Sequence, residues 1–125
     1  MSRVHRSLLV GLLLLVPVAS SGCGSSGAAS IDAATVATAV VIDVRTPEEF
    51  AAGHLEGALN IPVESGDFAS VVSGLDPSLT YIVYCRSGRR SAVATEQMVA
   101  AGFSEVIDLG SLDNAASQTG LSVTT

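Results

Sequence analysis

The stretch "TYIVYCRSGRRSAVATEQMVAAG", residues 80–102, contains the clearest structural signal in this chain of 125 residues. Its first five residues are β-branched or aromatic and lead to Cys85, which is typical of a buried strand. Residues 89–102 have the spacing of an amphipathic helix that stops at Gly102. The helix side chains that we expect to face the core are Ala92, Val93, Met98 and Val99. A strand that passes directly into a helix predicts an α/β protein, with residues 85–91 as the connecting loop.

Short segments on either side repeat the same alternation. Strands are predicted at 39–45, 58–62 and 105–110, and helices at 46–53 and 67–75. In the first of these helices, Thr46 is suited to the N-cap, Pro47 to the first position and Gly53 to the stop. Strands that alternate with helices indicate a mainly parallel sheet.

The length of the chain indicates its number of domains, and its charge limits the class of its partners. The length suggests one folded domain, which we place at 31–125. Twelve acidic residues stand against six arginines, with no lysine, for a formal net charge of −6. Such an acidic chain argues against nucleic acid as a partner.

The first residues have the features of a targeting segment. A basic start precedes an apolar run at residues 8–19, shorter than the about 20 residues that span a bilayer. Cys23 follows among small residues, and the whole resembles a bacterial lipoprotein signal, although Ser20 stands where that pattern usually has Leu, Val or Ile. We therefore expect a lipoprotein-type signal peptide at 1–22 and a flexible tether at 23–30. Lipid on Cys23 would anchor the protein to the cell membrane outside the cytoplasm; the alternatives are ordinary cleavage with secretion, and an unprocessed anchor.

Cys85 has the sequence surroundings of a reactive thiol. It stands at the carboxyl end of a predicted parallel strand, where ligands bind in open α/β sheets. Gly88 allows the loop to turn its amides inward as an anion-binding nest, next to the positive end of a helix dipole. Three arginines, Arg86, Arg89 and Arg90, add positive charge. This pattern favours nucleophilic catalysis by a thiolate of lowered pKa; the alternative is an inert core cysteine beside ordinary surface arginines.

Two blocks of the sequence resemble the rhodanese-like domain. They are "VIDVRTPEEFAAGHLEGALNIP" (41–62) and "YIVYCRSGRRSAVATEQMVAAGF" (81–103). The resemblance implies a mainly parallel five-stranded sheet with helices on both faces. It also implies a sulfurtransferase in which Cys85 takes sulfur from thiosulfate or a related small anion, holds it as a persulfide, and passes it to cyanide, a thiol or an unidentified protein acceptor.

The resemblance also suggests roles for individual residues. The active loop would consist of Arg86, Ser87, Gly88, Arg89, Arg90 and Ser91. Within it, Arg86 and Arg90 match residues that bind the substrate anion, while Asp43 and Arg45 match a pair that supports the loop. We expect Glu49 to pair with an arginine or to face water, and His54 to be a hydrogen-bonded turn residue rather than a catalytic base. No metal or other cofactor is inferred.

Two other functions remain open. Phosphatases and arsenate reductases of a related kind use Cys-x5-Arg, but the sixth residue after Cys85 is Ser91, so Arg90 stands one position early. The shorter loop is expected to suit a sulfur atom better than a phosphoryl group. The other possibility is a rhodanese-like module that senses or binds sulfur species, or relays redox changes, without turnover.

Overall fold

The computed structural model describes residues 30–125, which form one α/β unit. The predictions for the signal peptide at 1–22, for lipidation of Cys23 and for nearly all of the tether lie outside the described residues. In chain order the elements are α1 (Ala33–Thr38), β1 (Val40–Asp43), α2 (Pro47–Ala52), β2 (His54–Leu55), β3 (Leu59–Asn60), α3 (Phe68–Ser73), β4 (Thr80–Cys85), α4 (Arg89–Ala100), β5 (Glu105–Ser111), α5 (Leu112–Thr119) and β6 (Val123–Thr124).

The central sheet has the strand order β3-β1-β4-β5, and every neighbouring pair is parallel. This confirms the predicted parallel α/β architecture. The sheet formed by the described residues has four strands rather than the expected five. After β1 the chain leaves the sheet through α2, and the short strand β2 then pairs antiparallel with β6 near the C-terminus instead of joining the main sheet.

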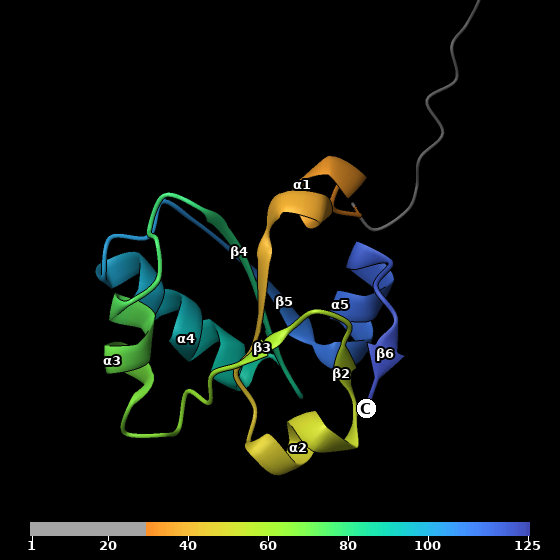
Figure 1. Cartoon of the computed structure of the whole chain (residues 1–125), viewed down its shortest axis with the longest axis horizontal. Coiled ribbons are helices and arrows are strands. Elements are labelled where there is room, and N and C mark those ends of the chain that lie inside the picture. The colour runs from red at the N-terminus through yellow and green to blue at the C-terminus, as the bar shows by residue number, and fades with distance from the viewer. Residues whose placement is uncertain (1–29) are drawn as a thin grey trace, which may run out of the picture.

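Helices cover both faces of the sheet, as predicted (Figure 1). Side chains of α3 and α4, such as Phe68 and Met98, pack with Ile42 and Val83 in one buried cluster. On the other face α5 contributes the buried Ala115, and α1 contributes the partly buried Val36. Helix α2 lies beyond the carboxyl end of β1 (Figure 1), so the carboxyl edge of the sheet is where α2 and the start of α4 can meet.

Helix α4 is rotated relative to the orientation that its apolar residues suggest. Its buried residues are Ser91, Ala94 and Met98, whereas Val93 and Val99 are 44% and 57% exposed. Of the four side chains expected to face inward, only Met98 is buried. Ser91 Oγ lies 3.5 Å from Cys85 Sγ at the end of β4. The positions three and seven residues later share its face of the helix, and they are buried with it.

None of the helices formed by residues 30–125 is long and apolar enough to cross a membrane.

Candidate active site

The loop between β4 and α4 places a cysteine at the carboxyl edge of the sheet. Cys85 is the last residue of β4 and has no exposed surface. Gly88 caps α4 with a left-handed φ of +96°, a conformation that favours glycine. A Cβ at this position would lie 3.4 Å from the Cα of Gly110. The left-handed turn therefore favours glycine, whereas the distance to β5 would leave a Cβ in ordinary van der Waals contact.

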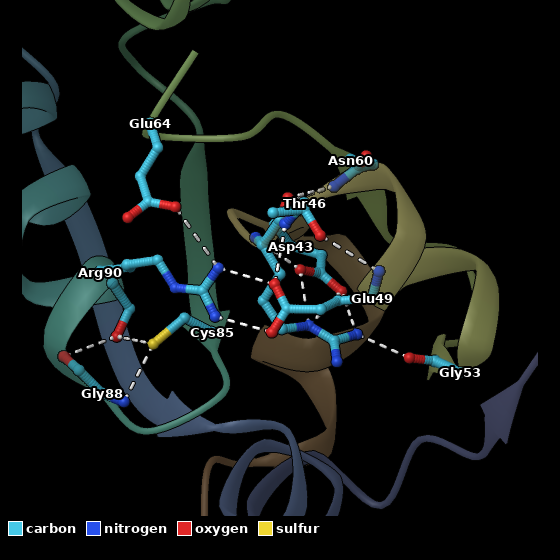
Figure 2. A network of polar contacts seen from close by, with 11 residues as sticks. Asp43, Thr46, Glu49, Gly53, Asn60, Glu64, Cys85, Gly88 and Arg90 are labelled. Atoms are coloured by element: carbon cyan, nitrogen blue, oxygen red, sulfur yellow. Dashed lines mark hydrogen bonds and ion pairs between the residues drawn. The ribbon is translucent and has the colours of Figure 1, made fainter.

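This turn directs hydrogen-bonding groups at the thiol. The backbone N–H of Gly88 donates to Cys85 Sγ at 2.9 Å, and Ser91 Oγ lies 3.5 Å from Sγ. Burial is the largest single influence and would raise the pKa of the thiol. The side chain of Ser91 and the backbone amides of Ser91, Gly88 and Ser87 together outweigh burial, and the pKa of Cys85 is lowered. The surroundings of Sγ therefore favour the thiolate (Figure 2).

The three arginines of the loop have different surroundings. Arg86 and Arg89 are exposed, whereas Arg90 is partly buried. Arg90 forms a two-pronged ion pair with Glu49, with Nη1–Oε2 and Nη2–Oε1 distances of 2.7 and 2.8 Å. The hydrogen bonds from Arg90 are the main reason why the pKa of Glu49 falls to about 2. Of the two outcomes expected for Glu49, pairing with an arginine is the one observed, while anion binding by Arg86 and Arg90 stays a prediction.

Glu49 is held in place by the first turn of its own helix. Its carboxylate accepts a hydrogen bond from the backbone N–H of Thr46 at 3.1 Å, and the Thr46 hydroxyl accepts one from the Glu49 N–H at 3.2 Å. This reciprocal capping box confirms that α2 begins at Thr46 and Pro47. The same carboxylate thus joins the start of α2 to the start of α4. The Thr-x-x-Glu spacing was visible in the sequence, but its partner Arg90 was not.

Asp43 and Arg45 form a buried ion pair at the end of β1. Arg45 Nη2 lies 2.6 Å from Asp43 Oδ2 and also donates to the carbonyl of Gly53 at 2.6 Å. The Arg45 guanidinium lies 5.7 Å from the ring centre of Tyr84, the residue before Cys85. The pair thus lies against the end of the strand that carries Cys85, and its support of the active loop stays a prediction.

His54 is hydrogen-bonded, as expected, but it begins strand β2 rather than lying in a turn. Its Nδ1 lies 2.8 Å from the carbonyl oxygen of Phe50, and its ring stacks on the Phe50 ring at 3.6 Å. Within residues 30–125, no three His, Cys, Asp or Glu side chains are grouped so that they could hold a metal ion.

A pocket of about 450 Å³ opens beside the active loop. The loop and α4 contribute four of its lining residues, and the segment after β3 contributes two. The lining residues are Val63, Glu64, Ser87, Arg89, Arg90 and Val93. Glu64 Oε2 lies 3.8 Å from Arg90 Nη1. Val63 and Glu64 could not be predicted as site residues, since no local sequence pattern marks the segment that carries them.

The chain combines a parallel α/β sheet with a cysteine loop whose hydrogen bonds favour the thiolate. These two features define a class of proteins with an activated thiol. Comparison with known proteins identifies the family within that class. The profile of the rhodanese-like domain matches residues 28–115, and the chain belongs to this family. The rhodanese-like fold expected from the two sequence blocks is therefore confirmed.

The relatives and structural neighbours agree with this assignment. Thiosulfate sulfurtransferase PspE of Escherichia coli K12 is 36% identical over 75 residues, which are 60% of this chain and 72% of that protein. Thiosulfate sulfurtransferase 16 of Arabidopsis thaliana is 42% identical over 78 residues, 54% of this chain and 65% of that protein. The match thus spans about two thirds of each relative's length.

Among solved structures, an E. coli structure described as a rhodanese with anions matches with a TM-score of 0.57 and 33% identity, covering 69% of this chain and 96% of that one. A rhodanese-related protein from Thermoplasma volcanium matches with a TM-score of 0.61 and 28% identity, covering 76% of this chain and 96% of that one.

Proposed function

We propose that this protein is a sulfurtransferase that carries sulfane sulfur on Cys85, from thiosulfate or a related anionic donor to a thiophilic acceptor such as cyanide or a thiol. The observation that carries the proposal is the hydrogen bond of 2.9 Å from the Gly88 amide to Cys85 Sγ, in a loop that lowers the pKa of the thiol. Relatives named thiosulfate sulfurtransferase support this activity in general terms.

In the first half of the proposed cycle, the Cys85 thiolate attacks the outer sulfur of thiosulfate. A new S–S bond forms at Sγ, the S–S bond of the donor breaks, and sulfite leaves with the electron pair. The exposed Arg86 and Arg89 attract the anionic donor. We expect the amides that favour the thiolate to stabilise the negative charge of the resulting persulfide as well.

Access to the thiol requires motion. Cys85 has no exposed surface, so a donor reaches Sγ only when neighbouring side chains or the loop move aside. This burial favours one other function, a rhodanese-like module that takes up sulfur slowly and does not discharge it. The two functions differ in the second half of the cycle, in which an acceptor removes the sulfur.

The test is intact mass spectrometry of the purified protein before thiosulfate, after thiosulfate, and after subsequent cyanide. A sulfurtransferase gains the mass of one sulfur atom at Cys85 and loses it with cyanide, and Cys85→Ser gains none. A gain that cyanide does not reverse would indicate the sensing module. Equal turnover by Cys85→Ser would refute the mechanism.

We also propose that the protein is a lipoprotein of the cell membrane, anchored outside the cytoplasm through lipid on Cys23. The support is the sequence alone: a basic start, a short apolar run and a cysteine among small residues. Metabolic labelling with a fatty acid tests the proposal, because Cys23→Ser should lose the label. Release of unlabelled protein from cells would indicate secretion instead.

A further inference from the structure

We propose that the pocket beside the active loop binds the sulfur acceptor as a zwitterionic aminothiol, a small thiol with both an ammonium and a carboxylate group, and that Glu64 selects the ammonium. This inference rests on the proposed sulfurtransferase function and names the substrate class of its second half. The size, the lining side chains and the charges of the pocket support it, independently of the reactivity of Cys85.

The pocket is larger and more apolar than an inorganic donor needs. Its volume of about 450 Å³ lies within the range of about 300–1,000 Å³ that is usual for small organic ligands. Val63 and Val93 line it, and Val93 is 44% exposed although it stands on the helix next to the active loop. Apolar walls favour a ligand with a carbon skeleton and contribute nothing to the binding of sulfite or thiosulfate.

Both signs of charge line this one pocket. Arg89 is an exposed cation at the first position of α4, and Glu64 is an anion with a side chain that is 67% exposed. The Nη atoms of Arg90, by contrast, already donate to Glu49 at 2.7 and 2.8 Å. A ligand with one group of each sign can therefore pair its carboxylate with Arg89 and its ammonium with Glu64.

Glu64 is held in the fold by a long ion pair with Arg90. Among the described residues its side chain makes no hydrogen bond, and its nearest cation is Arg90 at 3.8 Å, beyond hydrogen-bonding distance. Its carboxylate is therefore available to an ammonium group. The Glu64 carboxylate also repels a dianion, so it would be unfavourable in a pocket that binds thiosulfate alone.

The pocket lies beside the loop that carries the thiol, although the buried Cys85 is not among its lining residues. A bound acceptor therefore reaches the sulfur when the loop moves aside, as the donor does. Ser87, Arg89 and Arg90 belong to the loop that surrounds Cys85, and Figure 2 shows Glu64 pointing toward Arg90. The acceptor, deprotonated to its thiolate by loss of a proton to water, attacks the outer sulfur of the Cys85 persulfide. An S–S bond forms on the acceptor, the S–S bond to Sγ breaks, and the electron pair returns to Cys85 as a thiolate. No oxidant or reductant is consumed.

Three acceptors that differ in charge test the inference: cysteine with both groups, cysteamine with the ammonium alone, and 3-mercaptopropionate with the carboxylate alone. The rate of discharge of the persulfide, preloaded with thiosulfate, is measured for wild type and Glu64→Gln. Each acceptor is compared with itself across variants, so differences in intrinsic thiol reactivity cancel.

Glu64→Gln should slow discharge by cysteine and by cysteamine about threefold to fivefold, the most that a largely exposed ion pair provides. Discharge by 3-mercaptopropionate should stay the same or become faster. Arg89→Gln should give the complementary pattern, slowing the two carboxylates and sparing cysteamine. The matched control is Glu105→Gln, which removes the same charge at the opposite edge of the sheet, where Glu105 contacts Thr80 at the start of β4; it should change none of the three rates.

Discharge by cyanide, which has neither an ammonium nor a carboxylate group, distinguishes failure of the sulfurtransferase function from failure of the zwitterion site. If thiosulfate leaves no persulfide on Cys85, the sulfurtransferase function fails and this inference fails with it. If the persulfide forms and cyanide discharges it normally, but Glu64→Gln alters all three thiols alike or alters none, the zwitterion site alone is overturned.

Discussion

The ion pair between Glu49 and Arg90 gives the most quantitative prediction. Replacing Glu49 with Gln removes the charge but keeps a side-chain carbonyl oxygen for the Thr46 amide, since Gln serves in a capping box as well as Glu. The start of α2 should therefore remain intact. What Glu49→Gln loses is the charge of the two contacts of 2.7 and 2.8 Å to Arg90.

The pKa of the Glu49 carboxylate gives the size of the unfolding free energy that Glu49→Gln loses, and how that loss depends on pH. Hydrogen bonds from Arg90 lower the pKa of Glu49 from 4.5 to about 2, a difference that would be worth about 3 kcal/mol in a shielded pair. Because the Glu49 side chain is 25% exposed, solvent screening reduces this to about 1–2 kcal/mol. Since the pKa is lowered on folding, the stabilisation is fully present above pH 4.5 and is lost as the pH falls toward 2.

Urea unfolding of wild type and Glu49→Gln between pH 7 and pH 3 measures this contribution. At pH 7 the variant should unfold with a free energy about 1–2 kcal/mol lower, and its melting temperature should fall by about 4–8 °C for each kcal/mol. The difference between the two proteins should shrink below pH 4.5. The matched control is Glu48→Gln, an exposed neighbour in the same first turn, which should stay within about 0.5 kcal/mol of wild type.

Two results would refute this reasoning. A difference that stays constant from pH 7 to pH 3 would mean that the ionised carboxylate is not the source of the stability. Equal losses in Glu48→Gln and Glu49→Gln would assign the effect to the helix dipole rather than to Arg90.

Three further predictions concern the thiol and its supports. Ser91→Ala should raise the pKa of Cys85, because Ser91 is the main group that lowers it; the midpoint of iodoacetamide alkylation against pH should move upward, and an unchanged midpoint would contradict the assigned cause. Gly88→Ala should cost about 1–3 kcal/mol of unfolding free energy, because φ is +96° there, and chemical denaturation with an unaltered midpoint would count against it. Arg45→Met should cost about 3–5 kcal/mol by leaving the fully buried Asp43 without its cation, and a loss below about 1 kcal/mol at pH 7 would show that the pair is dispensable.

Several features of the fold could be predicted because their causes are local. The β-branched run that ends at Cys85, the glycine turn and the helix that follows lie within 80–102, and each is dictated by neighbours in the chain. The start of α2 was predictable for the same reason, since Thr46 caps the helix and Pro47 occupies its first turn. Periodicity and capping act over a few residues, so a sequence reveals them directly.

Elements that depend on distant partners could not be predicted from the pattern of their own residues. Helix α5 is polar along most of its length and has one buried residue, Ala115, which packs against the sheet. Strands β2 and β6 have two residues each and pair only with one another, across nearly 70 positions of sequence. Segments this short carry no periodic signal, so only their tertiary contacts define them.

For the candidate site, the sequence by itself indicated the candidate nucleophile, the loop that surrounds it and the gathering of positive charge, all within residues 85–91. Only the tertiary structure decided how that charge is used: Glu49, 41 residues before Arg90, holds one guanidinium, and Glu64 from the segment after β3 lines the pocket with Arg89. It also decided the rotation of α4, which exposes Val93 to the pocket. The physical reason is that capping and turn formation are governed by adjacent residues, whereas ion pairs and pockets depend on which segments the sheet brings to its carboxyl edge.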